Sequence, residues 1–123
     1  MTPPRERIGF IGLGNMGRPM ASSLLRTGFA VTAFDTAAGQ VDLLVERGAK
    51  RAGDVASLIA ASDVVITVLP NTPDVAGVVS VLAEGGRAKM LMIDMSTIDP
   101  AASRTFGTVL SGKGIRFVDA AVG

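Results

Sequence analysis

Short apolar runs alternate with longer amphipathic segments along the whole chain. The apolar runs predict six strands, over Arg7–Ile11, Ala30–Phe34, Ala49–Ala52, Val64–Leu69, Met90–Asp94 and Ile115–Val118. The segments between them have apolar residues at helical spacing, which predicts helices over Asn15–Thr27, Ala38–Arg47, Asp54–Ala61, Thr72–Ala83 and Asp99–Ser111. Strands that alternate with helices in this way indicate an α/β domain built on a parallel sheet.

Several helix starts have characteristic boundary residues. Asp54 is placed to cap its helix, and Thr72-Pro73 and Asp99-Pro100 both have a capping residue followed by proline. Asn15 is the expected N-cap of the first helix, which makes Pro19 the fourth helical residue. The amide of that position has no partner within the helix, so Pro19 is compatible with it.

Length and composition narrow the class of protein. A chain of 123 residues with 48% hydrophobic and 19% charged residues fits one globular domain and excludes a disordered chain. The 12 basic and 11 acidic residues give a net charge of +1, so we expect neither a nucleic-acid nor a membrane partner. The apolar runs are far shorter than the ~20 residues of a spanning helix, and no signal-peptide core is visible. We therefore expect a cytoplasmic protein.

Missing residue types exclude several chemistries. The chain has no cysteine, which excludes disulfides, thiolate catalysis and zinc–cysteine sites. It also has no histidine, which excludes histidine-dependent triads and imidazole metal ligands. We accordingly predict no metal site.

The first predicted strand runs into a glycine-rich loop, Gly12-Leu13-Gly14-Asn15-Met16-Gly17, that opens a helix. In such a G-x-G-x-x-G loop, the first glycine allows a tight turn and the second lets the backbone approach a pyrophosphate. The third lets the helix pack close to the strand, and free amides at the helix start hold the phosphates. With 15 glycines, the spacing alone should occur in roughly one of five shuffled sequences. Its position between a strand and a helix is what predicts a dinucleotide site.

An acidic residue follows the second predicted strand. Asp35 lies 18 residues after Gly17, where a carboxylate can accept a hydrogen bond from a ribose 2′-hydroxyl. A carboxylate there repels a 2′-phosphate, and no arginine occurs in the next four residues, so the sequence favours NAD over NADP. The alternative interpretation is that Asp35 only begins a turn.

Two further loops follow predicted strands, at Leu69-Pro70 and at Ser96-Thr97. Ligands of open parallel sheets bind outside the carboxyl ends of the strands, so both loops are expected near the glycine loop. A strand-ending proline and an ordinary loop hydroxyl explain them equally well.

Together these residues resemble the β-hydroxyacid dehydrogenase family, whose members include 3-hydroxyisobutyrate dehydrogenase, tartronate semialdehyde reductase and 6-phosphogluconate dehydrogenase. The resembling segments are Ile8–Ala21, Asp63–Pro70, Ile93–Pro100 and Phe117–Val122. The resemblance implies a Rossmann-type doubly wound parallel sheet with strand order 3-2-1-4-5-6. It further implies that an all-helical domain follows, completes the active site and dimerises. We therefore expect residues 1–123 to be a dinucleotide-binding domain that is incomplete at its C-terminal end.

The resemblance also implies particular cofactor contacts. The backbone around Asn15 and Met16 would meet the pyrophosphate, and Leu69-Pro70 would line the cofactor. Asp74 would add a polar contact, and Thr97 would lie near the nicotinamide ribose.

Two departures from the family concern substrate and catalysis. The family's substrate motif reads Asp-Ala-Pro-Val-Ser-Gly-Gly, whereas Ala121 replaces the proline and Gly123 the serine; Val122 and Gly123 are the expected substrate-binding residues. The catalytic lysine of the family belongs downstream of residue 123, and no lysine of this chain lies in a matching motif. We therefore predict no catalytic residue within the chain.

The resemblance implies the NAD(H)-binding portion of an oxidoreductase that transfers hydride between a nicotinamide cofactor and a small β-hydroxyacid. The chain alone is expected to be inactive and to form homo-oligomers, with the last predicted strand as the contact. The alternatives are a non-catalytic dinucleotide-binding or assembly module, a relative that reduces imines, and a methyltransferase that binds S-adenosylmethionine.

Overall fold

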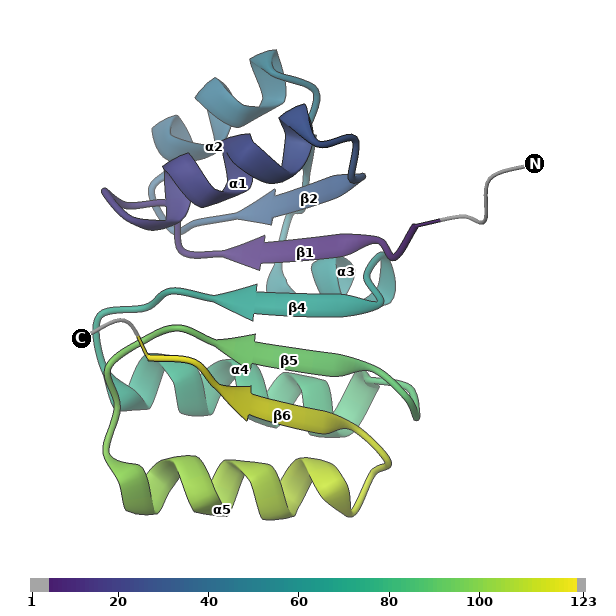
Figure 1. The fold of residues 1–123 in the computed structure, drawn as a ribbon, viewed down its shortest axis with the longest axis vertical. Coiled ribbons are helices and arrows are strands. Elements are labelled where there is room, and N and C mark those ends of the chain that lie inside the picture. Colours follow the sequence, from purple (N-terminus) through teal and green to yellow (C-terminus); the bar gives the residue numbers. More distant parts are fainter. Residues whose placement is uncertain (1–4, 122–123) are drawn as a thin grey trace.

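A computed structural model describes residues 5–121 and contains one parallel six-stranded sheet (Figure 1). The strand order is β3-β2-β1-β4-β5-β6, as the sequence predicted. The strands are β1 (Ile8–Ile11), β2 (Val31–Phe34), β3 (Lys50–Arg51), β4 (Val64–Thr67), β5 (Leu91–Asp94) and β6 (Arg116–Asp119). The helices are α1 (Gly17–Arg26), α2 (Ala38–Glu46), α3 (Val55–Ala60), α4 (Thr72–Gly85) and α5 (Pro100–Ser111).

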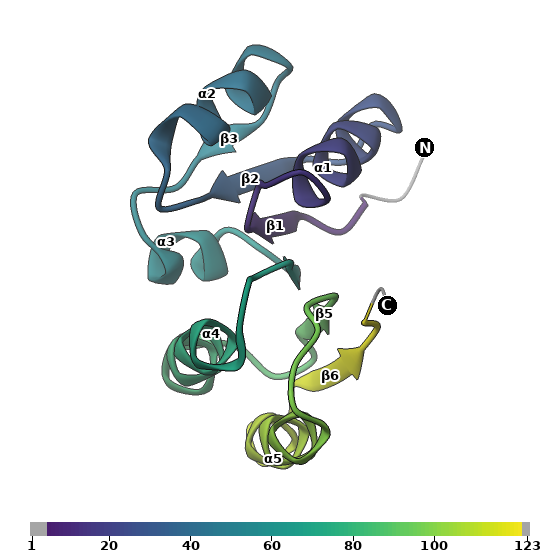
Figure 2. The ribbon, with the colours of Figure 1, turned by 90° about the vertical axis from the view of Figure 1, so that its left-hand side faces the viewer.

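The helices cover the two faces of the sheet in separate groups (Figure 2). Helices α1 and α2 share one apolar core with β1 and β2, centred on Phe10 and Leu44. Helices α3, α4 and α5 share the other core, centred on Leu58, Leu82 and Met92. Strand β1 lies between both cores and is buried at all four positions, which explains its nearly continuous apolar sequence.

One part of the sheet has a helical layer on a single face. Within residues 5–121, no helix covers β5 and β6 on the side where α1 and α2 lie (Figure 2). Strand β5 alternates between half-buried and buried positions, and Val118 of the edge strand β6 is 45% exposed. The uncovered face therefore presents apolar side chains.

Two of the expected helix caps are wrong by one residue. Met16, with helical backbone angles, occupies the N-cap position of α1 in place of Asn15. Pro19 is then the third helical residue, and its position still needs no intrahelical donor. Asn71 caps α4 by accepting a hydrogen bond from the Asp74 amide, so Thr72 is the first helical residue. The caps predicted at Asp54 and Asp99 are confirmed.

The fourth predicted strand is shorter than expected. It ends at Thr67, although the Val68 amide still donates to the carbonyl oxygen of Ile11. Leu69 and Pro70 therefore belong to the loop at the carboxyl end of the sheet. Among residues 5–121, no helix has the length and apolar character needed to cross a membrane.

Candidate functional site

A cleft of about 680 Å³ opens at the carboxyl ends of β1, β2 and β4. Its walls are the glycine loop, the residues after β2, the start of α3, the loop after β4 and the first turns of α4. This volume lies within the range of about 300–1,000 Å³ that is typical of small-molecule sites. The lining includes most of the residues expected to bind a cofactor: Gly12, Gly14, Asn15, Met16, Gly17, Asp35, Leu69, Pro70 and Asp74.

The three loop glycines have distinct roles. Gly12 has φ +96°, and a Cβ there would lie 2.1 Å from the carbonyl oxygen of Val68. A Cβ at Gly17 would lie 2.0 Å from the carbonyl oxygen of Gly12. Gly14 has no neighbouring atom within 4 Å of its Cβ position. Gly12 and Gly17 thus allow the loop to fold against β1 and β4, whereas Gly14 leaves open space on the cleft side.

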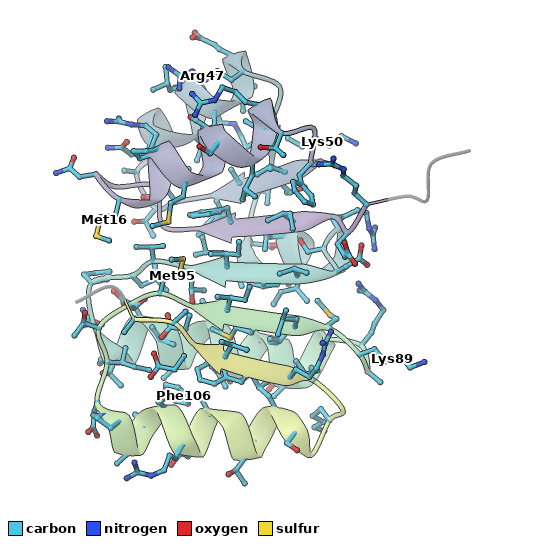
Figure 3. The ribbon with its side chains drawn as sticks, viewed as in Figure 1. Met16, Arg47, Lys50, Lys89, Met95 and Phe106 are labelled. Atoms are coloured by element: carbon cyan, nitrogen blue, oxygen red, sulfur yellow. The ribbon has the colours of Figure 1, made fainter. Side chains whose placement is uncertain are left out.

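The start of α1 is free of side-chain capping. Asp54, Asn71 and Asp99 cap α3, α4 and α5, whereas no side chain caps α1 at Met16 or α2 at Ala37. Met16 is 42% exposed and lies at the carboxyl end of the sheet, as does Met95 (Figure 3). The first amides of a helix carry partial positive charge, and here they adjoin the open space at Gly14. This arrangement suits an anionic group such as a pyrophosphate.

Asp35 connects the glycine loop with the loop after β2. Its Oδ2 accepts a hydrogen bond from the Leu13 amide at 2.7 Å, and its Oδ1 accepts one from the Ala37 amide at 2.8 Å. A carboxylate oxygen can accept more than one hydrogen bond, so Asp35 retains capacity for a ligand hydroxyl. The bond to Ala37 fits the turn interpretation, and the place in the cleft fits the ribose interpretation. The two interpretations are compatible.

The lining of the cleft is short of positive charge. Among the described residues that line it, none is lysine or arginine. Arg18, one residue after the loop, instead donates to the Oε1 atom of Gln40 at 3.1 Å. The charged groups among these lining residues are therefore two carboxylates, that of Asp35 after β2 and that of Asp74 on the first turn of α4.

Some expected site residues lie elsewhere. The Leu13 side chain is fully buried in the core beneath α1, so only its backbone amide, bonded to Asp35, is at the site. Thr97 is exposed and does not line the cleft. Val122 and Gly123 lie outside the described residues.

The cleft also contains residues that sequence reasoning missed. Phe34 and Thr36 flank Asp35, Val55 begins α3, and Val78 lies one helical turn beyond Asp74. Val78 could have been predicted from the sequence, because it lies four residues after Asp74 and residues at that spacing share one face of a helix.

Comparison with known proteins identifies the family. The family model for the NAD binding domain of 6-phosphogluconate dehydrogenase matches residues 7–123. The 2-(hydroxymethyl)glutarate dehydrogenase of Eubacterium barkeri is 39% identical over 94% of this chain and 40% of its own length. The mitochondrial 3-hydroxyisobutyrate dehydrogenase of Drosophila melanogaster is 40% identical over 95% of this chain and 36% of its own length.

Solved structures share the fold. The 3-hydroxyisobutyrate dehydrogenase of Mycobacterium tuberculosis, solved with L-serine, has a TM-score of 0.86 and 31% identity over 91% of this chain and 38% of its own. A reductive aminase of Aspergillus terreus, solved with NADPH and ethyl levulinate, has a TM-score of 0.80 and 28% identity over 91% of this chain and 39% of its own. The chain thus spans about 40% of the length of the curated relatives it matches. It belongs to the family of NAD-binding domains found in 6-phosphogluconate dehydrogenase and the hydroxyacid dehydrogenases.

Proposed function

We propose that this chain is the NAD(H)-binding portion of an oxidoreductase that acts on a small β-hydroxyacid. The observation that carries the proposal is the convergence of the Gly14 space, the uncapped start of α1 and the Asp35 carboxylate in one cleft. The names of the two curated relatives, both dehydrogenases of hydroxyacids, support the reaction class.

The residues present fit a dinucleotide. Gly14 offers the open space that close approach of a pyrophosphate requires, and the amides around Asn15 and Met16 adjoin it. Asp35 would accept from the ribose, and the loop after β4 would line the cofactor. The proposed contacts are Gly12, Leu13, Gly14, Asn15, Met16, Gly17, Asp35, Leu69, Pro70, Asp74 and Thr97. When bound, a nicotinamide cofactor supplies hydride transfer, and the protein supplies its position.

We propose a preference for NAD over NADP. NADP carries a phosphate in place of the ribose 2′-hydroxyl, and the Asp35 carboxylate repels that added charge. No cationic side chain among the described lining residues offsets this repulsion. The same carboxylate accepts a hydrogen bond from the hydroxyl of NAD.

We propose that the chain supplies the cofactor half of the reaction, and that none of its residues transfers the proton stays a prediction. Val122 and Gly123 stay the proposed start of the substrate site, and the single domain over residues 1–123 stays a prediction, as does the cytoplasmic location. We propose that the isolated chain is inactive. Its substrate would be a small hydroxyacid, which this chain would bind together with further polypeptide.

Imine reduction is the second candidate. The reductive aminase of Aspergillus terreus shares the fold and was solved with NADPH. Gly123, in place of the family's serine, removes a hydroxyl that would contact a hydroxyacid. A clear preference for NADPH would favour this candidate over the hydroxyacid dehydrogenase.

We further propose that the chain self-associates. Strand β6 is an edge strand, and Val118 is 45% exposed beside the uncovered face of β5. Exposed strand edges with apolar side chains favour association. A single monomeric species in light scattering at high concentration would contradict this.

The decisive experiment is calorimetric titration of the chain with NADH, NADPH and S-adenosylmethionine. Calorimetry suits this chain because it has no tryptophan whose fluorescence could report binding. We expect NADH to bind more tightly than NADPH and S-adenosylmethionine not to bind. Tighter binding of S-adenosylmethionine would support the methyltransferase alternative, and absence of binding by all three would overturn the proposal for the isolated chain.

A further inference from the structure

A buried carboxylate lies at the end of β5, behind the wall of the cleft. Asp94 is fully buried, and its Oδ1 accepts hydrogen bonds from the Thr67 hydroxyl at 2.8 Å and the Ser96 amide at 3.1 Å. Its Oδ2 has no hydrogen-bond partner among the described residues. A carboxylate buried in this way destabilises the fold relative to an apolar side chain, so its presence needs a reason other than packing.

Asp94 belongs to a set of hydrogen bonds that connects two loops. Ser96 is 2% exposed, and its hydroxyl accepts a hydrogen bond from the Leu69 amide at 2.7 Å. The backbone adds a bond from the Met95 amide to the Thr67 carbonyl oxygen at 2.8 Å. We call the side chains of Thr67, Asp94 and Ser96 the Asp94 clasp. It joins the end of β4 and the loop after it to the loop after β5.

The clasp acts on a segment that touches the glycine loop. Leu69 lines the cleft, and its Cδ2 lies 3.2 Å from the position of a Cβ on Gly12. The carbonyl oxygen of Val68 is closer still, at 2.1 Å from that position. Any displacement of Val68 and Leu69 therefore changes the wall of the cleft beside the glycine loop.

We propose that Asp94 is a positioning residue for the dinucleotide. It orients Ser96, and Ser96 holds the Leu69 amide so that the loop after β4 stays against Gly12. The Asp94 clasp thus sets the width of the cleft before the cofactor arrives. This inference rests on the proposed dinucleotide function, and nothing in it requires Asp94 to touch the cofactor.

The first test compares two buried serines. Ser96→Ala removes the acceptor of the Leu69 amide, and we expect NADH affinity to fall by about fivefold or more. Ser62→Ala is the matched control, because Ser62 is also fully buried, but its hydroxyl donates to the Leu58 carbonyl oxygen at the end of α3. The control is expected to lower the melting temperature and to leave NADH affinity unchanged. Equal NADH affinity in the two variants would overturn the inference.

A second pair of variants tests Asp94 through its hydroxyl partner. Thr67→Val keeps the side-chain shape and removes the donor to Asp94, whereas Thr67→Ser keeps the hydroxyl. We expect weaker NADH binding in Thr67→Val and restoration in Thr67→Ser. If Thr67 has only a structural role, NADH affinity will not depend on whether residue 67 has a hydroxyl.

Hydrogen exchange of the Leu69 amide gives a readout that needs no cofactor. We expect faster exchange in Thr67→Val than in Thr67→Ser, because the acceptor on Ser96 becomes less ordered. Equal exchange rates would overturn the inference even if the chain bound no NADH. Absence of NADH binding by the unmodified chain, with the expected exchange difference, would instead contradict the proposed function.

Discussion

At the amino end of the sheet Asp63 is surrounded by arginine, whereas at the carboxyl end Asp35 is bonded to backbone amides and faces the cleft. Asp63 accepts hydrogen bonds from the backbone amide of Arg7 at 2.8 Å and from its Nε and Nη2 at 3.2 and 3.1 Å. A second guanidinium, that of Arg87, lies 3.9 Å away. The hydrogen bonds from Arg7, side chain first and backbone second, lower the pKa of Asp63 to about 2.

The carboxyl end has polar groups with capacity to spare. Asp35 has one protein donor to each oxygen, Gly14 adjoins open space, and the start of α1 has no side-chain cap. Lys50 and Lys89 lie at the opposite end, away from this region (Figure 3). The comparison teaches that a carboxylate paired with guanidinium groups contributes to stability, whereas one with free acceptor sites beside a cleft is available for a ligand.

The largest expected effects come from the loop glycines, because one shapes the fold and another leaves room for a ligand. Gly17→Ala places a Cβ 2.0 Å from a backbone oxygen, so we expect the free energy of unfolding to fall by about 3 kcal/mol or more.

Gly14→Ala meets no protein atom within 4 Å, so we expect unchanged stability and at least about tenfold weaker NADH binding. Urea unfolding and calorimetry measure the two effects. Full NADH affinity in Gly14→Ala would contradict the pyrophosphate assignment.

The next effect concerns the choice of cofactor. Asp35→Asn keeps the side-chain shape and removes the charge, so the repulsion of a 2′-phosphate disappears. We expect NADH affinity to fall by about tenfold and the ratio of NADH to NADPH affinity to decrease. Asp63→Asn is the matched control, since it makes the same change at the other end of the sheet. An unchanged ratio in Asp35→Asn, measured by calorimetry, would show that Asp35 does not select the cofactor.

The order of the elements and the core of the site could be predicted because their signals are local. Apolar periodicity gave strands and helices, and the spacing of the glycines and Asp35 follows from one strand–helix–strand unit. The cap errors at Asn15 and Thr72 arose where a neighbouring residue could begin the helix equally well. The Asp94 clasp was not predictable, because its partners are 27 residues apart and meet only through the register of β4 and β5.

The pH dependence of stability tests the amino-end carboxylate. Its pKa is about 2 in the folded state against an ordinary value of 3.8, so the unfolded chain binds more protons between these values. The stabilisation by Asp63 is therefore complete above about pH 4 and is lost as the pH falls toward 2. Because both side chains are partly exposed, at 50% for Arg7 and 42% for Asp63, we expect Asp63→Asn to lower the free energy of unfolding at pH 7 by at most about 1 kcal/mol. An equal difference between variant and unmodified chain at pH 2 and pH 7 would contradict this assignment.

The smallest effect should come from a turn at the amino end of the sheet, where a change in backbone strain does not affect the cleft. Lys89 has φ +74°, a conformation that costs an L-residue about 1 kcal/mol, and its amide donates to the Gly114 carbonyl oxygen at 2.8 Å. Lys89→Gly keeps that bond and relieves the strain, but it also makes the unfolded chain more flexible. We expect a net rise in the free energy of unfolding of about 0.5 kcal/mol, with unchanged NADH affinity. Lys113→Gly is the control: Lys113 does not have positive φ, so the same change should lower stability. Lower stability in both variants would show that the left-handed turn is not strained.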